Sequence, residues 1–161
     1  MSSRARVGAC LAWAVLALAA CASGPPKPAV AKAQINVSAD VNPDSSGRAS
    51  PIVVRVFQLR GDAEFTGAEF FALYDKEKET LGASLISREE YVLQPGEQRM
   101  LELPLSREAR FVGAIAAYRN IQTARWRAIS VAPEKTLADM LKKDRVNIAV
   151  AKAAITLTTK D

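Results

Sequence analysis

The chain has 161 residues, of which 22 are Lys or Arg and 17 are Asp or Glu, so its formal net charge is +5. It contains no histidine, which excludes the commonest general base, the commonest zinc ligand and the histidine of nucleophilic triads. The charge is modest and its basic residues are spread along the chain, so composition does not indicate nucleic-acid binding.

The first twenty residues have the pattern of an export signal. Arg4 and Arg6 precede the apolar run VGACLAWAVLALAA at residues 7–20. A run of this length suits the core of a signal peptide and falls short of the roughly 20 apolar residues that a membrane-spanning helix needs. We therefore expect residues 1–20 to be a signal peptide that is removed.

The end of this signal resembles the lipobox of bacterial lipoproteins, because an aliphatic residue and two small ones, Leu18, Ala19 and Ala20, precede Cys21. Cleavage between Ala20 and Cys21 leaves a cysteine whose thiol can accept lipid. The other cysteine, Cys10, lies in the removed segment, so no disulfide is expected in the mature chain. The alternative is an ordinary secretory signal ending in A-x-A, with Cys21 an unmodified thiol.

Residues 21–33 are predicted to form a flexible tether that carries the lipidated cysteine. The segment opens with CASGPPKPAVAK, in which three prolines, one glycine and small side chains cannot build a core. The tether would hold the folded part, residues 34–161, below the membrane surface.

From Gln34 onward the pattern is mainly β, with short apolar or alternating segments separated by turn residues. The segment at 51–59 is apolar on both faces, which indicates a central strand covered on both sides. The last segment contains no proline or glycine, so it is interpreted as one long strand or two short ones. The predicted strands are 34–39, 51–59, 85–93, 99–105, 110–118, 125–131 and 146–158. Seven to eight short strands favour a two-sheet β-sandwich.

A helical insertion is predicted after the second strand. Thr66 and Glu69 have the spacing of a capping box, which predicts a helix over 66–74, followed by a polar turn or short helix that stops at Gly82. Aromatic residues at helical spacing predict that this helix docks onto a sheet; they are Phe65, Phe70, Phe71 and Tyr74. A second short helix, carrying Leu137, Met140 and Leu141, is expected within the connection at 133–143.

Catalytic motifs are absent from the sequence. There is no G-x-S-x-G, no S-x-x-K and no phosphate-binding glycine loop. Neighbouring carboxylates such as Glu89 with Glu90 lie in hydrophilic stretches, where solvated acids are the ordinary expectation. We therefore expect no enzymatic activity, no cofactor and no metal site.

The segment from Asp40 to Ser50, DVNPDSSGRAS, lies between the first two predicted strands. Its Asn-Pro-Asp and Ser-Ser-Gly stretches favour turns, and it is longer than the two to five residues of a tight hairpin loop. Exposed loops on a rigid scaffold often bind partners. Two interpretations remain open at this point: a binding loop and a plain surface loop.

Together these features resemble a known family, the type VI secretion system lipoproteins (TssJ, also called SciN). The resemblance rests on the lipobox, the Pro-rich tether and three segments. These are INVSADVNPDSSGRASPIVVRVFQLR, AEFFALYDKEKETLGASLISREEYVLQPGE and GAIAAYRNIQTARWRA. The last contains an aromatic-Arg pair and a Trp-Arg strand, here Tyr118 with Arg119 and Trp126 with Arg127.

The resemblance implies a transthyretin-like sandwich of two sheets with a helical addition. It implies a lipoprotein held by acyl chains on Cys21 at the periplasmic face of the outer membrane. Its partner would be the periplasmic C-terminal domain of the inner-membrane protein TssM, within a membrane complex that includes TssL. The family's partner-binding loop falls here on Asn42, Pro43, Asp44, Ser45, Ser46, Gly47 and Arg48. Ala22, which is not the aspartate associated with inner-membrane retention, agrees with the outer membrane.

A different class of function is the alternative hypothesis, a periplasmic carbohydrate-binding or enzyme-accessory lipoprotein on a similar sandwich. Exposed Trp or Tyr side chains clustered on one sheet face would favour it. The mature chain holds one tryptophan, Trp126, and three tyrosines that form no obvious stripe.

Overall fold

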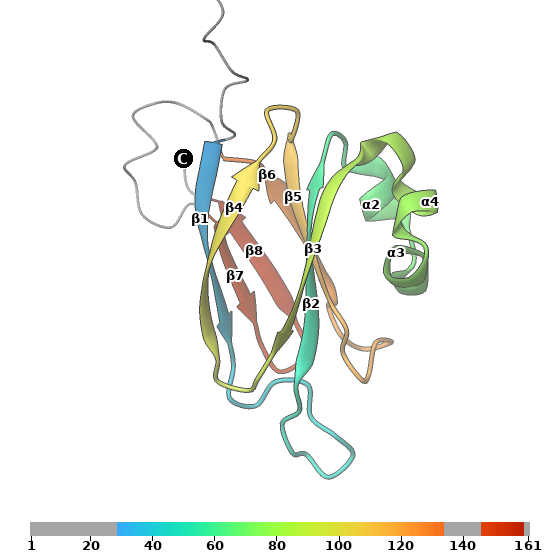
Figure 1. Ribbon diagram of the computed structural model, residues 1–161. Helices are drawn as coiled ribbons and strands as arrows, with labels where there is room; N and C mark the ends of the chain where they lie inside the picture. The colour runs from blue at the N-terminus through green and yellow to red at the C-terminus, as the bar shows by residue number, and fades with distance from the viewer. Residues whose placement is uncertain (1–28, 134–145, 160–161) are drawn as a thin grey trace, which may run out of the picture.

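Two four-stranded sheets form the fold, which we describe from a computed structural model. The structure describes residues 29–133 and 146–159. Its strands are β1 (Ala29–Val37), β2 (Ile52–Leu59), β3 (Leu85–Leu93), β4 (Gln98–Leu105), β5 (Phe111–Ala116), β6 (Arg127–Val131), β7 (Val146–Val150) and β8 (Ile155–Thr159). The order is β4-β1-β7-β8 in one sheet, here called the β1 sheet, and β3-β2-β5-β6 in the other, the β2 sheet (Figure 1). The mainly β, two-sheet prediction is confirmed, with eight strands in the described residues.

The core between the sheets contains buried aliphatic side chains from both of them. Ile35 and Ile148 come from the β1 sheet, and Val54 and Val112 from the β2 sheet; all four have no exposed surface. Alternating Leu103 and Leu105 of β4 also point into this core, as their spacing predicts. Burial of apolar surface here is the main force that holds the two sheets face to face.

The first strand begins earlier than the sequence suggests. Residues 29–33 were expected to end the tether, but they pair antiparallel with β4, from Ala29 opposite Leu105 to Ala33 opposite Leu101. Small alanines fit here because Ala31 and Ala33 point into the core. The expected tether up to residue 28, with Ala20 and Cys21, lies outside the described residues, as does the helix expected within 133–143.

The C-terminal segment forms two strands, which decides between the two interpretations. β7 runs parallel to β1 and β8 returns antiparallel to β7. The turn at residues 151–154 closes with a hydrogen bond from Ala151 N to Ala154 O of 2.8 Å. The chain turns here without glycine or proline, and the turn lets β8 pair with β7 along the whole length of both strands.

The helical insertion differs from the single helix predicted over 66–74. The structure has α2 (Ala63–Gly67), α3 (Phe70–Asp75) and α4 (Glu77–Leu81), followed by a 3-10 turn at Gly82–Ser84. Thr66 lies inside α2, where its hydroxyl donates to Asp62 O at 2.9 Å, so the capping-box prediction is wrong. The chain is extended at Ala68, and α3 begins after Glu69. The predicted stop at Gly82 is confirmed as the end of α4.

The insertion packs on the outer face of the β2 sheet (Figure 1). Phe65 is fully buried against Gly113 of β5, where a Cβ atom would lie 2.7 Å from the ring, so only glycine allows this close approach. The predicted docking of aromatic side chains holds for Phe65, Phe70 and Tyr74. It is wrong for Phe71, which is 63% exposed because α3 turns that side chain away from the sheet.

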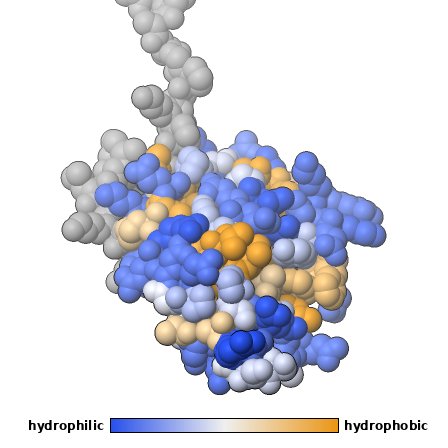
Figure 2. Space-filling view, turned by 60° about the horizontal axis from the view of Figure 1, so that its bottom comes forward, coloured by the Kyte–Doolittle hydropathy of each residue, from blue (hydrophilic) through white to orange (hydrophobic). Residues whose placement is uncertain are grey.

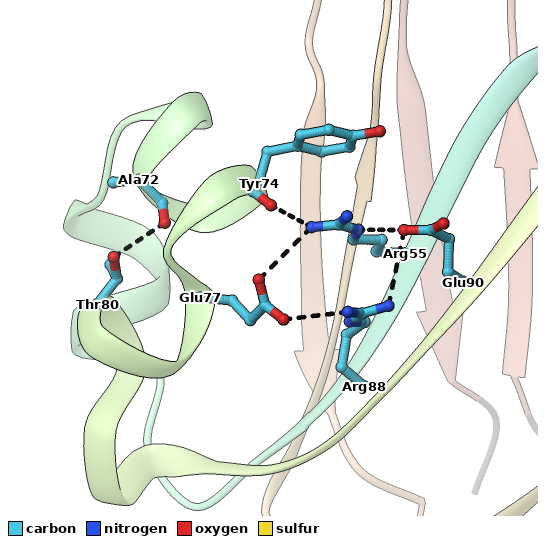
Figure 3. A network of polar contacts seen from close by, with 7 residues as sticks. All are labelled: Arg55, Ala72, Tyr74, Glu77, Thr80, Arg88 and Glu90. Atoms are coloured by element: carbon cyan, nitrogen blue, oxygen red, sulfur yellow. Dashed lines mark hydrogen bonds and ion pairs between the residues drawn. The ribbon is translucent and has the colours of Figure 1, made fainter.

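An ion-pair network attaches α3 and α4 to β2 and β3 (Figure 3). Arg55 donates to Glu90 at 2.6 Å and to the carbonyl of Tyr74, and it lies 3.6 Å from Glu77. Arg88 bonds Glu77 at 3.1 Å. Two carboxylates and the Tyr74 ring, 4.0 Å away, accommodate Arg55 in a central strand. Within the described residues, no helix has the length and apolar character needed to cross a membrane.

Candidate docking surface

The loop at residues 38–51 lies at the end of the sandwich opposite to Ala29. β1 starts at Ala29 at one end and delivers the chain to this loop at the other (Figure 1). The β5–β6 loop and the β7–β8 turn lie at the same end. Figure 2, which brings this end forward, shows mainly hydrophilic side chains with hydrophobic patches between them. The end that faces away from the entry of the chain is therefore largely polar.

Asp44 holds the tip of the loop in one shape. Its Oδ1 atom accepts the backbone N–H groups of Ser46 at 2.9 Å and Arg48 at 3.0 Å, and Oδ2 accepts Nε of Arg48 at 3.0 Å. The N–H of Arg48 is the main cause that lowers the pKa of Asp44, although burial acts in the opposite direction. A charged Asp44 therefore favours the closed loop.

Asn42 joins the loop to two other connections. Its Nδ2 donates to Pro51 O at 2.8 Å, its Oδ1 accepts Arg119 N at 2.8 Å, and its own N–H donates to Lys152 O at 3.0 Å. The residue is 4% exposed and has a φ of +48°, a conformation that asparagine tolerates better than most residues. Asn42 is thus a structural anchor whose side-chain amide bonds two other parts of the fold.

The seven residues of the predicted binding loop therefore fall into two groups. Asn42 is buried, and Pro43 and Asp44 are half-buried. The exposed members are Ser45, Ser46, Gly47 and Arg48. The structure brings all seven together, and the four exposed residues form the tip of the loop.

A hollow of about 270 Å³ lies beside this loop. Asn42 and Pro43 line one side, Tyr118 and Thr123 of the β5–β6 loop line another, and Lys152 lines a third. Sequence reasoning missed this feature because its three walls lie far apart in the chain. The positive φ of Asn42 is the closest local signal, but only the fold shows which segments that residue joins.

Aromatic side chains do not form an exposed platform on the described part of the chain. Trp126 is half-buried, with its ring centroid 5.2 Å from that of Phe70 in an edge-on contact. Tyr118 is buried and donates its hydroxyl to Ala151 O at 3.0 Å. These rings stabilise the fold, so they do not support the carbohydrate-binding alternative. No group of three or more potential metal ligands occurs in residues 29–133 and 146–159.

Solved structures with this fold include two proteins of type VI secretion systems. The T6SS lipoprotein TssJ1 from Pseudomonas aeruginosa is 30% identical, with a TM-score of 0.73, over 83% of this chain and 98% of that one. Serratia marcescens Lip, a membrane bound component of the type VI secretion system, is 28% identical, with a TM-score of 0.71, over 83% and 99%.

A third match shows the fold alone, at 23% identity and a TM-score of 0.64. It covers 81% of this chain and 98% of a chain in a structure described as the T6SS protein TssM C-terminal domain from EAEC. No curated protein sequence matches the chain.

A family model matches residues 29–153. It is the T6SS-SciN model, described as type VI secretion lipoprotein, with the names VasD, EvfM and TssJ. The match covers β1 to β7, the helical insertion and the loop at 38–51, and it ends just before β8. It describes a lipoprotein component of a secretion system and not a family of enzymes. The chain therefore belongs to the type VI secretion lipoprotein family.

Proposed function

We propose that this protein is a non-catalytic docking subunit of a type VI secretion membrane complex. Acyl chains on Cys21 anchor it to the periplasmic face of the outer membrane, and the loop at residues 42–48 binds the periplasmic C-terminal domain of TssM. The observation that carries the proposal is the position of this loop at the end of the sandwich opposite to Ala29. A domain tethered at one end presents its other end to a partner that approaches from the inner membrane.

Lipid chemistry supports an anchor at Cys21. One acyl chain gives marginal membrane binding and additional chains make it stable, so a cysteine carrying three chains resists extraction. The prolines between Cys21 and Ala29 suit a short spacer between membrane and fold. A small sandwich can then act as a fixed receptor for a long partner.

The loop suits binding because its shape is set before a partner arrives. Asp44 closes the tip and Asn42 attaches the base, so little conformational entropy is lost on binding. The Arg48 side chain is 80% exposed, and its N–H groups that do not contact Asp44 can donate charge-assisted hydrogen bonds.

The test is a pull-down with the periplasmic domain of TssM. One variant replaces residues 45–48 with Gly-Ser-Gly-Ser, which leaves the anchors Asn42 and Asp44 in place. The matched control is Arg107→Ser, which removes one exposed arginine from the β4–β5 connection at the other end of the sandwich. We expect the loop variant to lose binding and the control to retain it. Equal binding by both would show that the loop is not the contact.

The anchor is tested separately by Cys21→Ala in the full chain. The variant should appear in the soluble periplasmic fraction and fail to support secretion. Continued fractionation of the variant with the outer membrane would contradict the lipid anchor, whatever the result of the pull-down.

A further inference from the structure

The hollow beside the loop is lined by groups from three connections and is held in shape by hydrogen bonds. Asn42 attaches the β1–β2 loop to the backbone of Arg119 and of Lys152. Tyr118 attaches the β5–β6 loop to the β7–β8 turn through Ala151 O. All of these links are between 2.8 and 3.0 Å. The hollow is therefore a built feature of this end of the sandwich and not a gap between unconnected loops.

Lys152 lines the hollow together with Asp44, and two further cationic residues, Arg119 and Arg125, are next to lining residues in the chain. Arg119 follows Tyr118, Lys152 forms part of the wall, and Arg125 is fixed beside Ala153, whose carbonyl accepts Arg125 N at 2.9 Å. All three residues are exposed. Three cations stand here against one lining carboxylate, Asp44, which already pairs with Arg48, so the rim of the hollow is basic.

These cations differ from most other arginines of the domain in having no carboxylate at ion-pair distance, although the charge of Arg119 helps to lower the pKa of Asp44. Arg55, Arg60, Arg88 and Arg99 each form an ion pair with a glutamate. In the described segments, the side chains of Arg119, Arg125 and Lys152 make no hydrogen bond or close ion pair. Asp44 is the nearby carboxylate, but Arg48 and two backbone N–H groups already occupy its oxygens. The end of the sandwich that holds the loop at 38–51 therefore has an excess of positive charge.

We infer that the hollow and its basic rim receive an acidic segment of the protein partner, as a contact separate from the exposed loop tip at 45–48. Arg119 and Lys152 would pair with carboxylates of that segment, while Pro43, Ala124 and Ala153 provide an apolar wall for the stems of its side chains. The inference rests on the proposed function, because it names the chemistry of the partner's contacting segment. It also assigns part of the contact to the β7–β8 turn.

Charged groups at the rim of an interface act mainly on the association rate and on its dependence on salt. The experiment measures binding kinetics of the TssM periplasmic domain to the mature chain at several salt concentrations. The variant is Arg119→Glu with Lys152→Glu, and Arg107→Glu is the control with the same type of charge reversal. Arg119→Gln with Lys152→Gln is a milder version, because it removes the two charges without reversing them. The backbone bonds of both positions are kept.

We expect the double charge reversal to lower the association rate about tenfold at low salt and to flatten its salt dependence, with the dissociation rate changed by less than about threefold. The glutamine pair should show the same trend with a smaller effect, and the control should behave as the unmodified chain. Wild-type association rates in both double variants would overturn the inference, even if the loop variant had lost binding and so supported the proposed function.

Two further measurements separate the sources of negative charge. A glutamate-rich peptide should shift the amide resonances of residues 118–120 and 151–153 in the unmodified chain and not in the double variant, and this holds without TssM. No shift in the unmodified chain would overturn the inference independently of the pull-down. Vesicles of phosphatidylcholine and phosphatidylglycerol are the second probe. Charge-dependent binding to vesicles, combined with unchanged TssM kinetics, would assign the rim to a membrane and would also overturn it.

Discussion

The connection that enters β2, residues 38–51, and the connection that leaves it, residues 60–84, differ in where their side chains go. The leaving connection forms α2, α3 and α4 and buries Phe65, Phe70 and Leu73 on the β2 sheet. The entering connection buries Val41 and Asn42 and exposes its tip. The leaving connection is held mainly by apolar contact, and the entering connection is held mainly by hydrogen bonds.

The two connections therefore serve different purposes: the helical insertion stabilises the fold, and the loop at 38–51 presents residues for binding. A helical insertion that buries apolar side chains on a sheet strengthens the fold. A loop fixed at its base by Asn42 and closed at its tip by Asp44 keeps its exposed residues available at little cost in stability. Substitutions at the buried positions of the helical insertion should therefore destabilise the domain. Substitutions at the tip of the loop at 38–51 should change binding while leaving the fold intact.

The largest effect on stability is expected from Phe65→Ala. The ring is fully buried between Phe57 and Gly113, and removal of a buried phenylalanine costs about 3–5 kcal/mol of the free energy of unfolding. Urea denaturation followed by fluorescence measures the loss. Phe71→Ala, on an exposed ring of the same helical insertion, is the control and should change stability by less than about 0.5 kcal/mol. A similar loss in both variants would mean that burial does not distinguish the two rings.

An intermediate effect is expected from Asn42→Ala. The change leaves Arg119 N and Pro51 O without their partner and places alanine at a φ of +48°, so we expect a loss of about 2–4 kcal/mol. Asn42→Gly tolerates the backbone conformation and should recover about 1 kcal/mol of it. If alanine and glycine were equivalent, the backbone conformation would contribute nothing.

Partner binding should weaken in both Asn42 variants, because the loop and the hollow share this residue. The same pull-down used for the loop measures it, at a temperature at which both variants are folded. Full binding by a destabilised Asn42 variant would show that the partner does not need the three connections held together.

The comparison of the two connections also shows what could be predicted from the sequence. Alternation and apolar runs predicted β2, β3 and β4 to within about two residues, because strand periodicity is a local property. The break at Ala68 could not be predicted, because it depends on a distant residue. Nη1 of Arg127, which comes from β6, donates to the carbonyls of both Phe65 and Ala68. The position and composition of the loop at 40–50 were also local signals, whereas the anchoring role of Asn42 depends on two distant segments.

The smallest effect, and the finest comparison, concerns one carboxylate in each connection. Burial acts to raise the pKa of Glu77, but the hydrogen bond from Arg88 and the charges of Arg88 and Arg55 hold it below its usual value of 4.5. The pKa of Asp44 is also lowered, first by the N–H of Arg48. A carboxylate whose pKa is lowered on folding stabilises the fold at neutral pH. That contribution is lost as the pH falls through the folded-state value.

Glu77→Gln should therefore lower stability at pH 7 by about 1 kcal/mol, discounted because the network lies partly in solvent. The difference from the unmodified chain should shrink as the pH falls below about 4.5, where Glu77 begins to protonate in the unfolded chain. Asp44→Asn should follow the same direction with a smaller amplitude, because its pair with Arg48 closes only an exposed tip. Urea midpoints measured between pH 3 and pH 7 test both variants. A pH-independent loss in Glu77→Gln would mean that the side chain acts by packing and not through its charge, and the ion-pair network of Figure 3 would then not be what holds α4 to β3.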